Sequence, residues 1–275
     1  MVEKAYPKYE NLKKHNPWKD YFQDKSDDEI LCRIVAWDYE FIHPDDVEAM
    51  SRHDNGKKNK TFVYNKLPKP YRGNLKNPKL VILSLNPGFN ERVNRTLFDM
   101  LSPEFQKEFI KLSKDNLFLE DGCRIISKDK KVDDVLDNGY WTKQLSDIAK
   151  INDNYLDKIG LIQFIPYASK NYDSWDGEDR LGTQDFTKEI IIHLLEETHA
   201  LFLVMRAKEQ WEKLIRQEMH SDKYKDRFLY NRNPRCQKLS QRNLMDENAP
   251  NQDQFQMILD VLEDKKSIDK MSFYN

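Results

Sequence analysis

Two asparagines, each followed by a proline, stand out among the residues that could do chemistry. Asn86 opens the run Asn86-Pro87-Gly88, and Asn233 precedes Pro234. Proline fixes a turn, glycine lets a ligand approach the backbone, and the asparagine side chain offers both a donor and an acceptor. The same pairs also form ordinary turns. They therefore predict a ligand site only if the fold brings them together.

Four short apolar segments would position these asparagines. The segments are 79–85, 159–165, 200–205 and 227–230. Runs of consecutive apolar residues suit strands covered on both faces, and the long connections between them suit crossovers. Helical periodicity in the segments 185–198, 207–220 and 252–264 supplies the covering layers. The sequence thus predicts a three-layer α/β/α fold with a central four-stranded parallel sheet.

The predicted strands place polar loops at one edge of this sheet. In open parallel sheets the ligand crevice lies outside the carboxyl ends of the strands. The first strand runs into Asn86 and the fourth into Asn233, while the second runs into a loop that contains Tyr167. We expect Asn86 and Asn233 to face a common cleft, with Tyr167 on the same rim.

The chain divides into three parts by composition. We expect residues 1–60 to form a mainly helical extension, residues 61–264 the α/β domain and residues 265–275 a tail. Ser26-Asp27-Asp28-Glu29 resembles a helix N-terminus within the extension. Prolines 68 and 70 predict an irregular connection between extension and core.

Composition limits the function classes. The formal net charge of −2 provides no general attraction to a polyanion, so nucleic-acid binding would need a local patch. Cys32, Cys123 and Cys236 are scattered, as are the six histidines, so we expect reduced thiols, no metal and no cofactor. No apolar stretch reaches the roughly 20 residues that a membrane span needs, and the start lacks an apolar signal segment. These features predict a cytoplasmic protein.

The two asparagine motifs together resemble the signatures of the uracil-DNA glycosylase superfamily. Leu83-Ser84-Leu85-Asn86-Pro87-Gly88 is similar to the first signature of the mismatch-specific uracil and thymine glycosylases, and Asn233-Pro234 with Leu239-Ser240 is similar to the second. The resemblance covers roughly residues 66–264 and includes the helix around Trp211. It implies a DNA N-glycosylase that needs no metal or cofactor.

The resemblance also implies roles for individual residues. Asn86 would position the water that attacks the sugar C1′, and Asn233 would face an oxygen of the base. Pro87, Gly88 and Tyr167 would line the substrate site. Phe89 or Phe98 would stack on the flipped base, although Phe98 could equally belong to the core. Leu239 would match the wedge that fills the gap left by that nucleotide.

Some residues depart from the family pattern or allow a second interpretation. Ser84 stands in place of a glycine, Arg235 in place of a serine, and two extra residues separate Asn233-Pro234 from Leu239. Glu91 could act as a base or simply begin a helix. The second loop carries basic residues that could hold DNA phosphates or only face solvent, and these are Arg232, Arg235, Lys238 and Arg242.

Three functions are compatible with these observations. The first is hydrolysis of the N-glycosidic bond of uracil or another damaged base in DNA, through Asn86 and Asn233. The second is an inactive nucleotide-binding or nucleic-acid-binding module of the same fold. The third is an interaction protein that acts through residues 1–60.

Overall fold

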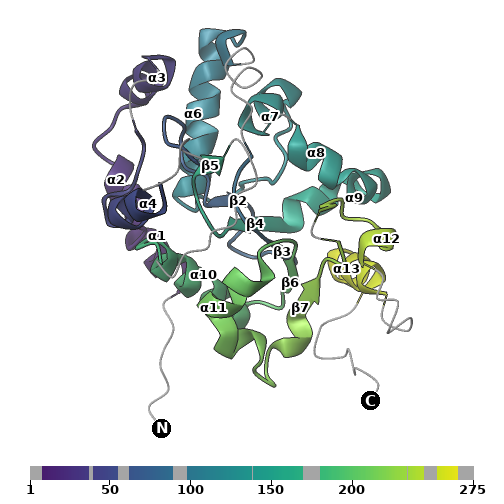
Figure 1. Ribbon diagram of the computed structural model, residues 1–275. Coiled ribbons are helices and arrows are strands. Elements are labelled where there is room, and N and C mark those ends of the chain that lie inside the picture. Colours follow the sequence, from purple (N-terminus) through teal and green to yellow (C-terminus); the bar gives the residue numbers. More distant parts are fainter. Residues whose placement is uncertain are drawn as a thin grey trace.

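The computed structural model describes residues 8–36, 40–54, 62–88, 98–137, 139–169, 180–233, 235–244 and 253–265. They form a mixed α/β fold (Figure 1). The strands are β1 (Phe62–Val63), β2 (Tyr71–Gly73), β3 (Leu80–Ser84), β4 (Ile159–Gln163), β5 (Ala168–Ser169), β6 (Leu201–Val204) and β7 (Phe228–Tyr230). The helices are α1 (Tyr9–Lys14), α2 (Pro17–Phe22), α3 (Asp27–Ala36), α4 (Val47–Asp54), α6 (Pro103–Leu117), α7 (Lys130–Asp137), α8 (Tyr140–Gln144), α9 (Ser146–Ile151), α10 (Gln184–Glu197), α11 (Lys208–Met219), α12 (Gln241–Leu244) and α13 (Gln254–Leu262). Short 3-10 turns at η1 (Pro44–Asp46), η2 (Asp153–Lys158) and η3 (Lys225–Arg227) complete the set.

The main sheet has five strands in the order β2-β4-β3-β6-β7. The pairs β4–β3, β3–β6 and β6–β7 are parallel, whereas β2 pairs antiparallel with β4. The expected sheet of four parallel strands is therefore corrected to a mixed sheet of five. The fifth strand lies in the segment after Pro68 and Pro70 that we expected to be irregular. An edge strand tolerates prolines in its approach because one of its sides makes no ladder hydrogen bonds.

Helices cover both faces of the sheet. Alternate residues of β3 point to opposite sides, so that Val81 and Leu83 join one hydrophobic cluster while Leu80 and Ile82 join the other. The first cluster includes buried residues of α1, α2, α3, α6, α10 and α11, and the second includes those of α8, α9, α12 and α13. Figure 1 shows these two groups of helices on opposite sides of the strands. Leu201 of β6 is also fully buried, as expected for a sheet covered on two sides.

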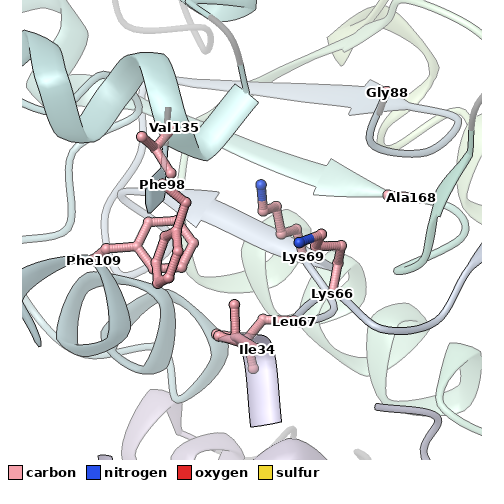
Figure 2. A pocket seen from close by; sticks show the side chains of 9 residues that line it. All are labelled: Ile34, Lys66, Leu67, Lys69, Gly88, Phe98, Phe109, Val135 and Ala168. Atoms are coloured by element: carbon pink, nitrogen blue, oxygen red, sulfur yellow. The ribbon is translucent and has the colours of Figure 1, made fainter. Parts of the chain in front are cut away.

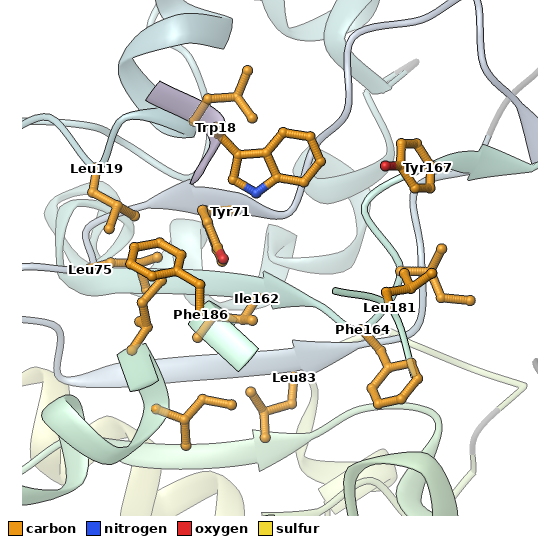
Figure 3. Packing of buried hydrophobic residues seen from close by; sticks show 14 of the residues in the cluster. Trp18, Tyr71, Leu75, Leu83, Leu119, Ile162, Phe164, Tyr167, Leu181 and Phe186 are labelled. Atoms are coloured by element: carbon orange, nitrogen blue, oxygen red, sulfur yellow. The ribbon is translucent and has the colours of Figure 1, made fainter. Parts of the chain in front are cut away.

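The N-terminal helices share the first hydrophobic cluster with the sheet. Trp18 of α2 is fully buried between Tyr71 of β2 and Tyr167, which follows β4 (Figure 3). Leu12 of α1 and Ile30 of α3 belong to the same cluster. The hydrophobic core therefore includes residues on both sides of position 60. The division of the chain into two parts at that position stays a prediction.

A buried carboxylate fastens the N-terminal segment to the domain. Asp46 in η1 accepts hydrogen bonds from the Tyr167 hydroxyl (2.7 Å) and from the backbone N–H and hydroxyl of Thr183 (2.9 Å each). Thr183 is the N-cap residue of α10. Burial raises the pKa of Asp46, although these hydrogen bonds partly oppose that shift. The contacts join the residues before β1 to the helix that follows β5.

Candidate functional site

The turn after β3 holds the Asn86 side chain in one orientation. The Asn86 amide nitrogen donates to the Pro87 carbonyl oxygen at 3.0 Å and to the Ser169 hydroxyl at 2.7 Å. A carbonyl oxygen can only accept, so this pair of contacts fixes which end of the carboxamide carries the nitrogen. Both amide hydrogens are used within the protein. The Asn86 carboxamide oxygen is consequently the end that is left to accept a hydrogen bond from a ligand or water.

The backbone of the same turn continues the sheet toward β5. Ser169 donates its backbone N–H to the Pro87 carbonyl at 3.0 Å, and Gly88 forms an isolated parallel bridge with Ser169. Gly88 is exposed, and a Cβ built on it would meet no atom of the described residues within 4 Å. The turn therefore presents open backbone to its surroundings, as a ligand site requires.

A pocket begins at this turn. Its cavity volume is about 40 Å³, and it is lined by Ile34, Lys66, Leu67, Lys69, Gly88, Phe98, Phe109, Val135 and Ala168 (Figure 2). Gly88 and Ala168 form the side next to Asn86, since Ala168 precedes the Ser169 that holds the Asn86 amide. Phe98 and Phe109 form another side, with ring centroids 5.4 Å apart in an edge-to-face arrangement. Most of the lining is therefore apolar or aromatic.

Two lysines supply the charge of this pocket. Lys66 and Lys69 come from the segment between β1 and β2, where the Lys69 backbone N–H donates to the Pro166 carbonyl at 2.8 Å. Figure 2 shows their amino groups between the Phe98–Phe109 side and the Gly88–Ala168 side. These lysines were not among the site residues expected from the sequence. Their flanking prolines indicated only a connection, and nothing in the local pattern showed that it passes over the carboxyl end of β4.

The Asn233 side chain makes a hydrogen bond within the loop after β7. The side-chain oxygen of Asn233 accepts the backbone N–H of Arg235 at 3.0 Å, and the residue is exposed. The buried asparagine of this loop is Asn231, whose amide donates to the backbone oxygens of Asn233 (3.0 Å) and Cys236 (2.8 Å). Asn231 therefore holds the loop in shape. The Asn231 carboxamide oxygen is buried and has no hydrogen-bond partner among the described residues.

Two further residues of the expected site lie in the core. Tyr167 is 1% exposed, and its hydroxyl accepts from the His43 backbone N–H at 3.0 Å while it donates to Asp46. Burial and the neighbouring Asp46 raise the pKa of Tyr167 well above its ordinary value. Leu239 is fully buried in the second hydrophobic cluster. In this arrangement Tyr167 does not line the pocket, and Leu239 is not available as a surface wedge.

The basic residues of the loop after β7 differ in their surroundings. Arg232, Arg235 and Arg242 are exposed, whereas the Lys238 amino group lies 2.9 Å from an Asp147 carboxylate oxygen. Of these four basic side chains, Lys238 is therefore the one that forms an ion pair with Asp147. The Cys236 thiol lies in the same loop, and its pKa is lowered by a hydrogen bond from the Lys238 backbone and another from Asn243.

Asn86 and Asn233 follow the carboxyl ends of strands in the same parallel set. β6 alone separates β3 from β7, so both asparagines follow the same edge of the sheet, as expected. The pocket includes Gly88 and Phe98, but neither Asn86 nor Asn233 is among its lining residues. Phe89, Glu91 and Pro234 lie outside the described residues. Of the residues expected at the site, the structure thus brings Gly88 and Phe98 to one pocket.

Metal-binding groups and membrane-spanning helices were sought among the described residues. Within them, no group of three or more histidine, cysteine or acidic side chains is placed to hold a metal ion. No helix in the same ranges combines the length and apolar character needed to cross a membrane.

Comparisons with protein-family models, with curated proteins and with solved structures gave no match to this chain.

Proposed function

We propose that this chain is a uracil-DNA glycosylase-like hydrolase that cleaves the N-glycosidic bond of uracil or another damaged base in DNA. The observation that carries the proposal is the fixed carboxamide of Asn86, two residues before Gly88, which lines a pocket together with Phe98 and Phe109. Its oxygen can accept a hydrogen bond from a water molecule and so orient that water toward the sugar.

The reaction needs few protein groups. As the bond between C1′ and the base nitrogen breaks, the base leaves with the electron pair and the sugar acquires oxocarbenium character. The water held by Asn86 then adds to C1′ and gives up a proton to solvent. Phe98 lines the pocket, where its ring would contact the face of the base, and it also belongs to the first hydrophobic cluster.

A second function is supported by a different observation. The side chain of Asn233 is bonded within its own loop, and Leu239 is buried, so two residues expected to contact a flipped base and its gap are otherwise engaged. This arrangement suits a module of the same fold that binds a nucleotide or nucleic acid without hydrolysis.

One assay separates the two functions. The purified protein is incubated with labelled single-stranded and duplex DNA that contains uracil, hypoxanthine or xanthine, and alkali then cleaves any abasic site. Strand cleavage that depends on the protein and on the modified base supports the hydrolase. Intact strands with every substrate, together with retarded migration of the same DNA at low salt, support the binding module.

A further inference from the structure

A larger pocket lies along helix α4. Its cavity volume is about 390 Å³, and small-molecule sites commonly have volumes of about 300–1,000 Å³. It shares no described lining residue with the pocket that Gly88 and Phe98 line. This cavity is therefore large enough for a small organic molecule, and it is separate from the pocket considered for the base.

One face of α4 forms most of the lining of the α4 pocket. Its four residues, Val47, Met50, Ser51 and Asp54, are spaced as neighbours on a single helical face. At a rise of about 1.5 Å per residue, Val47 and Asp54 lie about 10 Å apart along the helix. Ile42 adds a further apolar side chain to the lining. The pocket thus has an apolar end at Val47 and an acidic end at Asp54.

The Asp54 carboxylate supplies the charge of the acidic end. Its Oδ2 atom accepts the Tyr64 hydroxyl at 2.7 Å, while Oδ1 is buried and has no hydrogen-bond partner among the described residues. A carboxylate can accept about four hydrogen bonds, so most of this capacity is unused within the described part of the chain. Asp54 is also the last residue of α4, where the carbonyl groups of the helix end add negative partial charge. A cation next to Asp54 would be stabilised by both.

The walls at this end are held by the core. The Tyr64 ring packs edge-to-face on Tyr167, with centroids 5.7 Å apart, and the Tyr64 carbonyl accepts the Phe41 backbone N–H at 2.7 Å. Burial and the adjacent Asp54 raise the pKa of Tyr64 above its ordinary value, and the charge of Glu40 adds to this rise. Tyr64 therefore stays a neutral donor to Asp54, and the potential around it is negative. Walls that are fixed before binding reduce the entropy lost with a ligand.

We propose that the α4 pocket binds a small organic amine in its protonated form. The ammonium group lies beside Asp54, and the apolar body of the ligand extends along α4 toward Val47. Val47 has 46% of its surface exposed, so a ligand in this position removes apolar surface from water. A metal ion such as Ca²⁺ needs six or more oxygen ligands and gains nothing from the apolar side chains of Val47 and Met50. The site involves neither Asn86 nor Phe98, and it goes beyond the proposed function.

The test compares two ligands of nearly the same shape and different charge. Phenethylamine is protonated at neutral pH, whereas phenethyl alcohol has the same ring and chain and is neutral. Isothermal titration of the full-length protein should show the amine binding about tenfold or more tightly than the alcohol, because only the amine pairs with the carboxylate. Asp54→Asn keeps an acceptor for the Tyr64 hydroxyl and removes the charge. This variant should bind the two ligands with similar affinity.

Two further variants serve as controls. Glu48→Gln removes a charge from an exposed residue of the same helix that pairs with Arg52 outside the pocket lining, and it should preserve the preference for the amine. Ser51→Tyr places a large side chain into the pocket from an exposed position, and it should weaken the binding of both ligands. Thermal unfolding of each variant verifies that it folds. If Asp54→Asn does not fold, Ser51→Tyr still tests the location, because an unchanged affinity for the amine would overturn the site.

The outcomes for the α4 pocket and for the proposed function are distinguishable. Equal affinity for the amine and the alcohol, no binding of the amine, or a preference that survives in Asp54→Asn would overturn the amine site, even if DNA hydrolysis is observed. A preference for the amine that requires Asp54 supports the site, even if no DNA substrate is cleaved.

Discussion

At the scale of single residues, the carboxamide of Asn86 gives the most direct prediction. Asn86→Ala should reduce the single-turnover rate of base release by about 100-fold to 1,000-fold, as is common when one positioned polar group is lost. Ser169→Ala removes one of the two acceptors that hold the carboxamide but leaves its oxygen in place, so a smaller loss, on the order of tenfold, is expected.

The measurement is a rapid-quench assay with enzyme in excess over labelled substrate, accompanied by a binding titration. Affinity for the DNA should change little in either variant, because each substitution affects the chemical step and leaves the contacts to DNA phosphates in place. An unchanged rate in Asn86→Ala would show that another group positions the water.

The site residues were expected from the residue types together with the family resemblance, and their roles stay predictions. Asn86 and Gly88 were selected because a polar turn after a buried strand suits a ligand site, and Phe98 because the resemblance implies an aromatic residue that stacks on the base. Tyr167 was misplaced because a tyrosine after a strand has the same sequence pattern whether its ring faces a ligand or the core. Its position was decided by Asp46, which lies more than a hundred residues away in the chain and accepts its hydrogen bond.

At the scale of elements, the contact between η1 and the start of α10 should contribute strongly to stability. Asp46→Ala leaves the Tyr167 hydroxyl and both Thr183 donors without their acceptor. Each buried donor without a partner costs about 1–3 kcal/mol, and part of this cost is recovered when the donors shift toward other acceptors. We therefore expect a loss on the order of 3 kcal/mol in the free energy of unfolding. Urea denaturation followed by circular dichroism measures it.

Asp45→Ala provides the matched control one residue away. The Asp45 side chain is 64% exposed and lies 3.6 Å from the His43 ring. Its removal should change the free energy of unfolding by less than about 0.5 kcal/mol, as for most surface positions. A similar loss in both variants would mean that the buried hydrogen bonds of Asp46 are not the source of the effect.

The elements themselves were predicted with uneven success. Strands β3, β4, β6 and β7 lie within a residue or two of their expected bounds, and so do the helices α10, α11 and α13. Both patterns used to predict them, consecutive apolar residues and helical periodicity, reflect which residues are buried. The edge strand β2 was missed because its three residues follow two prolines. Its stability comes from pairing with β4, which no local pattern shows.

At the scale of the whole molecule, the N-terminal helices behave as part of the core. A chain that lacks residues 1–60 should not reach a stable native state, because it would expose the apolar surface now covered by Trp18, Phe22 and Ile30. Expression of the truncated chain followed by gel filtration and thermal unfolding tests this. A truncated chain with a cooperative transition near that of the intact protein would instead support an independent domain beyond residue 60.

Binding to nucleic acid should depend on salt through the arginines of the loop after β7. Arg235→Ala and Arg242→Ala should each lower the slope of log affinity against log salt concentration by about one, as expected when one phosphate contact is lost. Lys238→Ala should have a smaller effect because Asp147 already neutralises that amino group. Fluorescence anisotropy with labelled DNA at several salt concentrations provides the slopes. No binding at low salt would favour a protein partner over DNA.

The two hydrophobic clusters also divide the tryptophans of the described residues. Trp18 and Trp211 are fully buried on one face of the sheet, and Trp141 is buried on the other, beside the Tyr140 ring. Indole fluorescence shifts to longer wavelength when the ring enters water. The emission of Trp18 and Trp211 therefore reports on one face of the sheet, and that of Trp141 reports on the other. Variants that keep one tryptophan at a time would therefore show whether the two helical layers detach from the sheet in a single step or one after the other.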